Sequence, residues 1–406
     1  MKNRIAAFLL GTALAFGAGS AAFAQDKAIK IGVLTDNSGL YSDLGGAGST
    51  LAAQMAVEDS GLAKKGWKID IVSADHQNKP DIAVNTARQW IDVDKVDIFM
   101  DVLNSGVALA VNNLVKEKNA IMINTGAASS DLTNAQCSPN TIHWVYDTYM
   151  LANSTGQALV KAGGDSWYFL TADYAFGHAL ERDTTAVVVK SGGKVIGGVK
   201  HPLNTADFSS FLLQAQASKA KIIGMANAGG DTTNTIKQAS EFGIVAGGQK
   251  LAGLLLFITD VHSLGLKVAQ GLNFTETFYW DLNDGTRAFS KRFSERSKNK
   301  AQPSMVQAGV YSGLIHYFKA LEAMGGNPHD GAKVVAKMKE MPTDDPLFGA
   351  GSIRADGRKI HPAYLFEVKK PEESKGPWDY YKLIGTTPGD KAFRPLSESA
   401  CPLVKK

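Results

Sequence analysis

The chain has few cysteines, nearly balanced charge and no long apolar run beyond its first residues. It contains two Cys in 406 residues, and its 43 Lys and Arg against 39 Asp and Glu leave a formal net charge of +4. A charge this small does not indicate a nucleic-acid-binding protein. No apolar stretch near 18 residues follows residue 24, so we expect no transmembrane helix there.

The motifs of common enzyme classes are also missing. There is no Gly-x-x-x-x-Gly-Lys-Ser/Thr loop, no Gly-x-Ser-x-Gly elbow and no His-Glu-x-x-His motif. The turn after the first expected strand, residues 35–46, is rich in Gly but lacks the dinucleotide-binding spacing. The eight His are scattered without the spacing of metal ligands. We therefore expect no enzyme, no cofactor and no metal site.

The N-terminus has the features of a secretory signal peptide. Lys2 and Arg4 precede a short apolar run, residues 5–19, and Ala22-Phe23-Ala24 supplies the small residues that signal peptidase requires. The run is too short to cross a bilayer core of roughly 30 Å. We predict that residues 1–24 are removed after Ala24 and that the remainder is exported to the periplasm.

Both cysteines lie in the exported part. An even number of Cys in an oxidising compartment favours a disulfide, here Cys137–Cys401, which would fasten the polar C-terminal tail. The alternative is two buried free thiols.

The first half of the exported chain alternates strands and helices. Short connections and a βαβαβαβ order predict a parallel sheet with helices on both faces. The expected strands are Ala28–Thr35, Trp67–Ala74, Val96–Asp101 and Ala120–Asn124, and the expected helices are Leu44–Ser60, Asp81–Trp90 and Val107–Glu117.

The same alternation starts again near Tyr149, and three helices and one more strand follow it. This order predicts two lobes, with the chain returning to complete the first. The expected strands are Ser166–Thr171, Lys194–Lys200, Lys221–Met225, Leu251–Leu256, Gly271–Thr277 and Ala363–Val368. The expected helices are Leu151–Ala162, His178–Lys190, Phe208–Ala217, Asp231–Phe242, Asp284–Ser297, Met305–Met324 and Gly331–Lys339.

Small polar residues follow two neighbouring strands, in segments 103–106 and 124–130. Ligands of open α/β sheets bind outside the carboxyl ends of the strands, and helix N-termini there favour an anion. The pattern indicates a site for a small carboxylate. Helix capping by Ser and Asn would explain each loop taken alone.

The order of these segments resembles the leucine/isoleucine/valine-binding family, the type I periplasmic solute-binding proteins of ABC importers. The resemblance covers essentially the whole exported chain. It implies an α/β fold of two doubly wound parallel-sheet lobes, joined by three crossing strands, with a ligand cleft between them. The segments that carry it are Ile29–Leu34 with Ser38-Gly39, Val102–Gly106, Ala120–Leu132, Thr171–Gly177, Asp207-Phe208-Ser209 and Tyr311–Glu322.

We expect residues 25–146 and 281–347 to form the first lobe, and residues 147–280 and 348–406 the second. The resemblance implies ligand contacts from both lobes. In the first lobe these are Tyr41, Leu44, Asn104, Ser105, Gly126, Ala127, Ala128 and Ser129, and in the second lobe Tyr174, Phe176, Asn227, Gly229 and Asp231.

One departure from the family pattern bears on the ligand. Amino-acid binders of the family carry an acidic residue where this chain has Leu254-Leu255-Leu256-Phe257. A ligand ammonium enclosed without an opposite charge would cost several kcal/mol. We therefore expect an amine-free carboxylate, with an aromatic acid preferred, whose apolar body could face Phe176, Leu255, Phe257, Tyr279 and Trp280.

The alternative is a branched-chain amino acid or amide binder of the same fold, in which Asp173 or Asp231 replaces the missing acid. In either case the resemblance implies hinge closure on the ligand, docking on an ABC permease in the inner membrane, and a monomer. A sensor kinase in place of the permease remains open.

Overall fold

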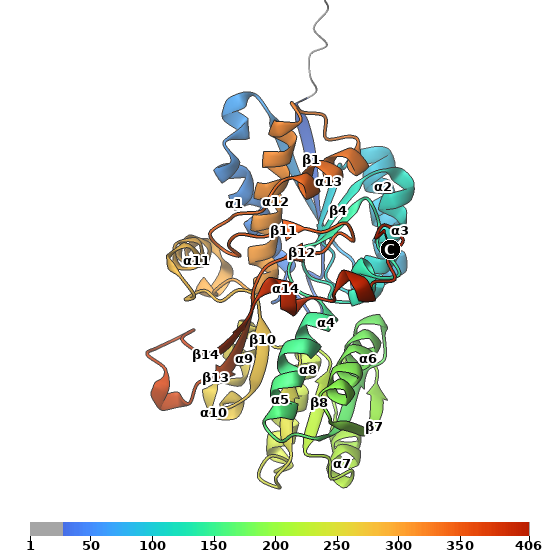
Figure 1. Cartoon of the computed structure of the whole chain (residues 1–406). Helices are drawn as coiled ribbons and strands as arrows, with labels where there is room; N and C mark the ends of the chain where they lie inside the picture. Colours follow the sequence, from blue (N-terminus) through green and yellow to red (C-terminus); the bar gives the residue numbers. More distant parts are fainter. Residues whose placement is uncertain (1–26, 406) are drawn as a thin grey trace, which may run out of the picture.

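The alternation of apolar strands with helices is realised in two α/β lobes placed one above the other (Figure 1). The computed structural model describes residues 27–405, so the predicted signal peptide lies outside the described residues. Among these residues, no helix is both long and apolar enough to cross a membrane.

The first lobe is built on a five-stranded parallel sheet with the order β2-β1-β3-β4-β5. Its central strands are mostly apolar and almost entirely buried because helices cover both faces. The strands are β1 (Ala28–Thr35), β2 (Lys68–Asp75), β3 (Ile98–Asp101), β4 (Ile121–Asn124) and β5 (Thr141–His143).

Helices of the first lobe pack in two layers. Ile31 and Val33 contribute to a core that contains Ala52 and Met55 of α1, whereas Phe99 and Met122 belong to a second core. Figure 1 shows α1 and α12 on one side of the sheet and α2 and α3 on the other. The helices are α1 (Gly46–Ser60), α2 (Pro80–Gln89), α3 (Ser105–Lys118), α11 (Asp284–Arg296), α12 (Met305–Ala323) and α13 (Gly331–Glu340).

The second lobe has a four-stranded parallel sheet with the order β7-β6-β8-β9. The predicted strand Leu251–Leu256 ends earlier, at Gly253, and the apolar run that follows is a loop. The strands are β6 (Ser166–Ala172), β7 (Lys194–His201), β8 (Ile222–Ala226) and β9 (Lys250–Gly253). The helices are α4 (Thr148–Leu151), α5 (Gln157–Lys161), α6 (Ala175–Lys190), α7 (Ser209–Ala217), α8 (Gly230–Glu241), α9 (Ile258–Leu264) and α10 (Leu266–Ala269).

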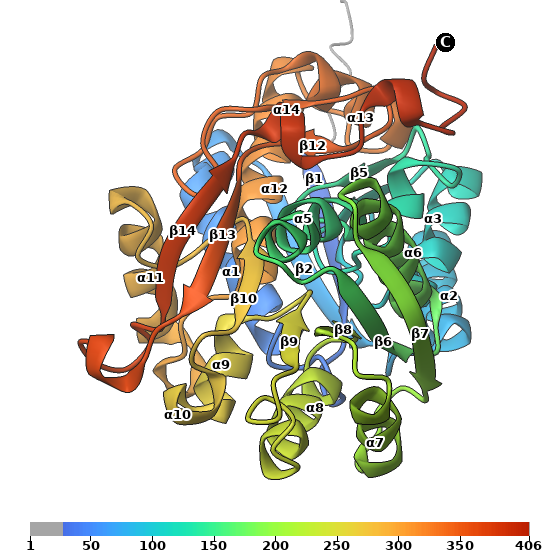
Figure 2. The ribbon, with the colours of Figure 1, turned by 60° about the horizontal axis from the view of Figure 1, so that its bottom comes forward.

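A three-stranded antiparallel sheet extends the second lobe, with the order β10-β13-β14. Figure 2 shows these strands side by side at one edge of the molecule. They are β10 (Asn273–Glu276), β13 (Ala363–Val368) and β14 (Tyr381–Thr387). The sequence analysis did not predict β14, because its residues after Tyr381 are largely exposed and show no regular alternation.

The chain passes between the lobes in three segments, residues 144–147, 277–283 and 361–362, as the fold class predicted. A short hairpin, β11 (Ser352–Ile353) and β12 (Lys359–Ile360), precedes the third crossing, and Arg358 bridges to His143 at the end of β5. The expected residue ranges of the lobes remain predictions.

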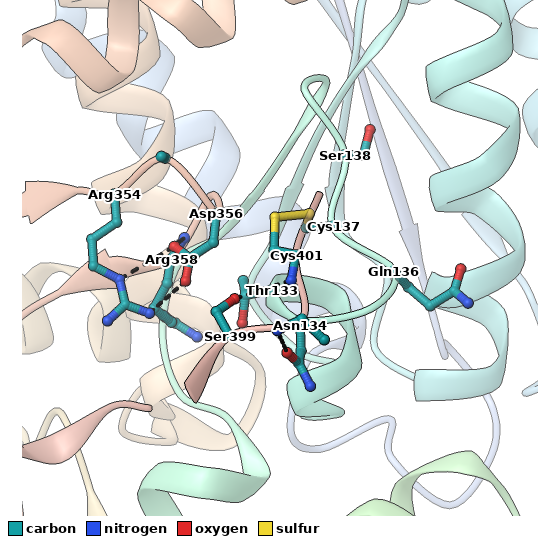
Figure 3. Close-up of a disulfide and its surroundings, with 12 residues drawn as sticks. Thr133, Asn134, Gln136, Cys137, Ser138, Arg354, Asp356, Arg358, Ser399 and Cys401 are labelled. Atoms are coloured by element: carbon teal, nitrogen blue, oxygen red, sulfur yellow. Dashed lines mark hydrogen bonds and ion pairs between the residues drawn. A yellow bond between two sulfur atoms is a disulfide. The ribbon is translucent and has the colours of Figure 1, made fainter. Parts of the chain in front are cut away.

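The C-terminal residues return to the first lobe. After β14 comes the short helix α14 (Gly389–Ala392). Cys401 is then joined to Cys137, with their Cα atoms 5.6 Å apart (Figure 3). The structure therefore contains the predicted disulfide.

Candidate ligand-binding site

A small pocket lies between the lobes, where the carboxyl ends of the parallel strands meet. The first lobe lines it with residues that follow β1, β3 and β4, the first crossing contributes Tyr146, and the second lobe adds residues that follow β6, β8 and β9. The lining consists of Tyr41, Leu44, Leu103, Ser105, Gly126, Ala128, Tyr146, Tyr174, Phe176, Ala228, Leu255 and Phe257.

The two lobes touch each other across this pocket. The hydroxyl oxygens of Tyr41 and Tyr174 lie 2.6 Å apart, and burial raises the pKa of both phenols. Gly229 has a φ of +57°, and a Cβ atom there would lie 2.8 Å from the carbonyl oxygen of Leu40. Only glycine combines this backbone conformation with so close an approach, so the structure shows the closed arrangement of the lobes.

Asp36, at the end of β1, positions the loop that carries Tyr41 and Leu44. Its buried carboxylate accepts hydrogen bonds from the backbone N–H of Gly39 (2.7 Å) and of Tyr41 (2.9 Å), and from the side-chain amide of Asn78 (2.6 Å). The sequence analysis did not single out Asp36. Its position directly after a buried strand was the available signal.

Four helices begin at or beside the pocket. α3 starts at the lining residue Ser105, Tyr174 is the N-cap of α6, and Phe257 is the N-cap of α9. Gly229, the N-cap of α8, follows the lining residue Ala228. No side chain caps α6 or α8, so their first N–H groups can bind a ligand. Helix N-termini carry partial positive charge, and together they favour an anionic group in the pocket.

The lining is otherwise aromatic and uncharged. Five of its side chains are aromatic rings, and Tyr146 meets Phe257 edge-on with centroids 6.0 Å apart. The Tyr146 hydroxyl donates to the carbonyl oxygen of Gly126 at 2.5 Å. Of the lining residues that the structure describes, none has a charged side chain. The pocket therefore combines apolar side chains with polar groups of the backbone.

Half of the predicted contact residues surround this pocket. Those in its lining are Tyr41, Leu44, Ser105, Gly126, Ala128, Tyr174, Phe176, Leu255 and Phe257. Their contact with a ligand remains a prediction.

Three first-lobe candidates stand beside the pocket and hold its loops. The Asn104 side chain caps α3, accepting from the N–H groups of Gly106 (2.9 Å) and Val107. The Ser129 hydroxyl accepts from the backbone of Asp131, and the Ala127 N–H donates to the side chain of Asn124. For Asn104 and Ser129 the capping interpretation describes the observed contacts.

In the second lobe, the two acids considered as ammonium partners do not line the pocket. The carboxylate oxygens of Asp231 accept from the N–H groups of Asn204 and Thr205 at 3.1 and 2.8 Å. Asp173 is half exposed and pairs with His178 at 2.7 Å. Both carboxylates thus have partners outside the pocket lining, and the expectation that either replaces the missing acid remains a prediction.

Three further second-lobe candidates also lie outside the lining. Asn227 bonds to Thr232 inside the lobe. Tyr279 stacks on Tyr381, and the Trp280 indole donates to a backbone carbonyl of the β13–β14 connection at 2.7 Å. Both rings therefore contact the antiparallel sheet or its connection and lie outside the pocket lining. Their contact with a ligand remains a prediction.

The lining contains three residues that the sequence analysis missed, Leu103, Tyr146 and Ala228. Leu103 and Ala228 lie next to predicted residues, in loops the analysis had identified. Tyr146 lies in the first crossing, and its place in the pocket depends on the path of the chain between the lobes.

Asp260 holds the N-terminus of α9, because its carboxylate accepts from the N–H of Phe257 at 2.9 Å. Burial raises the pKa of this carboxyl from 3.8 to about 7. In the unfolded chain the pKa is about 3.9, so between about pH 4 and pH 7 the folded chain binds the proton more tightly. The contribution of this group to stability is therefore largest at low pH and falls as the pH rises through that range.

We expect wild type to lose stability relative to Asp260→Asn when the pH is raised from about 5 to about 8. The asparagine keeps an acceptor oxygen but cannot ionise. All other titrating groups are the same in both proteins, so their contributions to stability cancel in the difference. Urea unfolding of both chains at the two pH values measures this. An equal difference at both would contradict the assignment.

The fold and the site define a class, the two-lobed proteins that bind a small solute between hinged α/β domains. The family described as periplasmic binding protein matches residues 28–376. The chain belongs to this family, whose members are solute-binding proteins of ABC transporters and not enzymes. The resemblance inferred from the sequence is thereby confirmed.

Solved structures and a curated relative support this membership. A periplasmic binding protein from Burkholderia mallei is 51% identical, with a TM-score of 0.90 over 93% of this chain and all of that one. A branched chain amino acid ABC transporter periplasmic ligand-binding protein from Burkholderia xenovorans is 40% identical, with a TM-score of 0.81 and coverage of 93% and 100%. A Leu/Ile/Val-binding protein homolog of Brucella abortus is 26% identical over 89% of this chain and 93% of its own.

The same fold occurs with an aromatic ligand. A solute-binding protein from R. palustris in complex with benzoate has a TM-score of 0.78 at 21% identity, over 92% of this chain and 99% of that one. At this identity the likeness concerns the fold alone.

Proposed function

We propose that this periplasmic solute-binding protein captures an aromatic carboxylate and delivers it to an ABC permease in the inner membrane. The observation that carries the proposal is the pocket lining, with five aromatic rings and no charged side chain among the described residues. Rings packed around an aromatic ligand add roughly 0.5–1.5 kcal/mol per pair beyond the burial of area.

The carboxylate would bind at the helix N-termini. Ser105 at the start of α3 and the uncapped first turns of α6 and α8 supply hydroxyl and N–H donors. Such neutral donors can hold an anion without a Lys or Arg, because the charge is shared among several dipoles.

An α-amino acid fits this lining less well. Its ammonium would lose water and meet no carboxylate, because Asp231 and Asp173 are engaged elsewhere. An unpaired buried charge costs several kcal/mol. The branched-chain amino acid alternative is favoured by the 40% identical relative from Burkholderia xenovorans, and it stays the second candidate.

A thermal-shift screen tests the proposal after unfolding and refolding to remove bound ligand. We expect benzoate and 4-hydroxybenzoate to raise the melting temperature, since a ligand at about 100 times its Kd adds about 2.7 kcal/mol of stability. Benzamide keeps the ring without the charge, and cyclohexanecarboxylate keeps the charge without the aromatic ring. Stabilisation by leucine or valine and not by the aromatic acids would overturn the assignment.

Closure couples binding to transport in this proposal. Contacts from both lobes exist together only when the lobes meet, so the ligand favours the closed state by its differential affinity. Moving from mostly open to mostly closed requires about 5 kcal/mol of such contact. The closed monomer would then dock on the permease.

A further inference from the structure

The C-terminal tail, residues 388–401, crosses from the second lobe back to the first. It leaves β14 in the second lobe and ends at the disulfide with Cys137, which lies between Ser130–Thr133 and β5 in the first lobe. We propose that this tail, here called the C-terminal strap, is a fourth and covalently closed connection between the lobes that stabilises the closed state. The effect on ligand affinity rests on the proposed function.

Three residues of the strap contact the second lobe: Lys391, Arg394 and Glu398, whose carboxylate lies 3.9 Å from the ammonium of Lys190 on α6. The side-chain amide of Asn153 donates to the carbonyl of Lys391 at 2.7 Å. The guanidinium of Arg394 donates to the carboxylate of Asp183 on α6 at 3.2 Å and lies over the ring of Tyr149, 4.6 Å from its centroid. Arg394 is mostly buried and Asp183 is 3% exposed, so solvent screens this ion pair less than a surface pair.

The strap is attached to the first lobe at its end and at the β11–β12 hairpin. Beyond the disulfide, the N–H of Ala400 donates to the side chain of Asn134 at 2.6 Å (Figure 3). Between these ends the strap passes the β11–β12 hairpin, where Arg354 donates to the carbonyl of Arg394 at 2.7 Å. The Arg358 guanidinium lies 4.5 Å from the ring centroid of Phe393.

Asp183 binds both the strap, through Arg394, and the first lobe, through Ser130. Its carboxylate also accepts from the hydroxyls of Ser130 and Thr148, both at 2.6 Å. Ser130 belongs to the first-lobe loop that carries the lining residues Gly126 and Ala128. The neighbouring Arg182 donates to Asp131 of the same loop at 3.2 Å. Moving the lobes apart would separate Asp183 from Ser130 and Arg182 from Asp131.

The disulfide fixes the end of the strap to the first lobe. While Cys401 is bonded to Cys137, the strap cannot follow the second lobe, so opening must break the Arg394–Asp183 contact or distort the strap. Without the disulfide, only hydrogen bonds and ring contacts hold the tail to the first lobe, so it can move with the second lobe at a lower cost. The disulfide and Arg394 should therefore act as one unit, and their effects should not add.

The experiment compares wild type with Cys137→Ser/Cys401→Ser, with Arg394→Ala and with the triple variant. Small-angle scattering of the ligand-free proteins reports the opening of the lobes independently of any ligand. We expect a larger radius of gyration in all three variants. We also expect a Kd for benzoate raised about threefold to tenfold, with the triple variant no weaker than the weaker parent. Lys333→Ala removes an exposed ion pair with Asp330 at the start of α13, within the first lobe, and should change neither quantity.

Unchanged scattering and affinity in the disulfide variant, or additive effects in the triple variant, would overturn the proposal. The disulfide variant could lose stability as well, because the bond closes a loop of 264 residues. Arg394→Ala keeps that bond and tests the strap without this loss. If no variant binds benzoate, the proposed ligand is wrong, and the scattering alone then decides for or against the strap.

Discussion

Replacing Leu255 by glutamate is expected to weaken benzoate binding by at least about 100-fold at pH 8. Leu255 is almost fully buried and lines the pocket. A carboxylate in its place would face the ligand's own negative charge in a space with little water. Isothermal titration calorimetry of both proteins measures the loss.

The matched control is Leu255→Gln, which has the same shape as the glutamate but no charge. We expect it to lose about tenfold or less, because its amide is polar but neutral. The glutamate variant should recover part of its affinity at about pH 5.5, since burial raises the pKa of a carboxyl and protonation removes the repulsion. Equal losses in the two variants would show that no anionic group binds near Leu255.

Gly177→Ala is expected to reduce both stability and binding. An added Cβ atom would lie 2.0 Å from the carbonyl oxygen of Ala172, at the end of β6. The Cβ atom is fixed to the backbone of α6, and the carbonyl oxygen is itself part of the backbone, so neither can turn aside. The helix α6 must therefore move, and Tyr174 and Phe176 of the lining move with it. We expect a loss of about 2 kcal/mol in urea unfolding and at least about tenfold in benzoate affinity, because site geometry must hold within about 0.5 Å.

Gly156→Ala, in the helical segment between α4 and α5, is the matched control. Its φ of −61° is helical, and an added Cβ atom would meet Thr184 at an ordinary distance of 3.5 Å. Alanine is the better helix former by about 1 kcal/mol, so this variant should be at least as stable as wild type and bind normally. A similar loss in both variants would contradict the role given to Gly177.

The elements with strong local patterns were predictable from the sequence. The strand Ala363–Val368 was predicted with its observed ends. Nine helices, α1–α3, α6–α8 and α11–α13, were found within a few residues because their apolar faces and start signals are local. The short helices α9 and α10 were not predicted, and α4 and α5 were predicted as a single helix. The disulfide followed from the count of Cys in an exported chain.

The loop Leu254–Phe257 shows where local reasoning fell short. Its apolar sequence predicted a continuation of the strand, because burial in a sheet and burial in a pocket select the same residues. The structure ends β9 at Gly253 and turns Leu255 and Phe257 into the pocket. Tyr279 and Trp280 were expected beside the ligand, but they lie outside the pocket lining and contact the antiparallel sheet and its connection.

By itself, the sequence determined the two-lobed α/β class, the loops that line the pocket and the absence of an acid where amino-acid binders have one. These properties depend on residue spacing along short segments and on which side chains are present. Only the tertiary structure decided which residues share the pocket, that Asp231 is committed to backbone N–H groups, and that Arg394 meets Asp183. Those contacts join residues up to 211 positions apart, and no local pattern specifies such pairs because they arise from packing of distant elements.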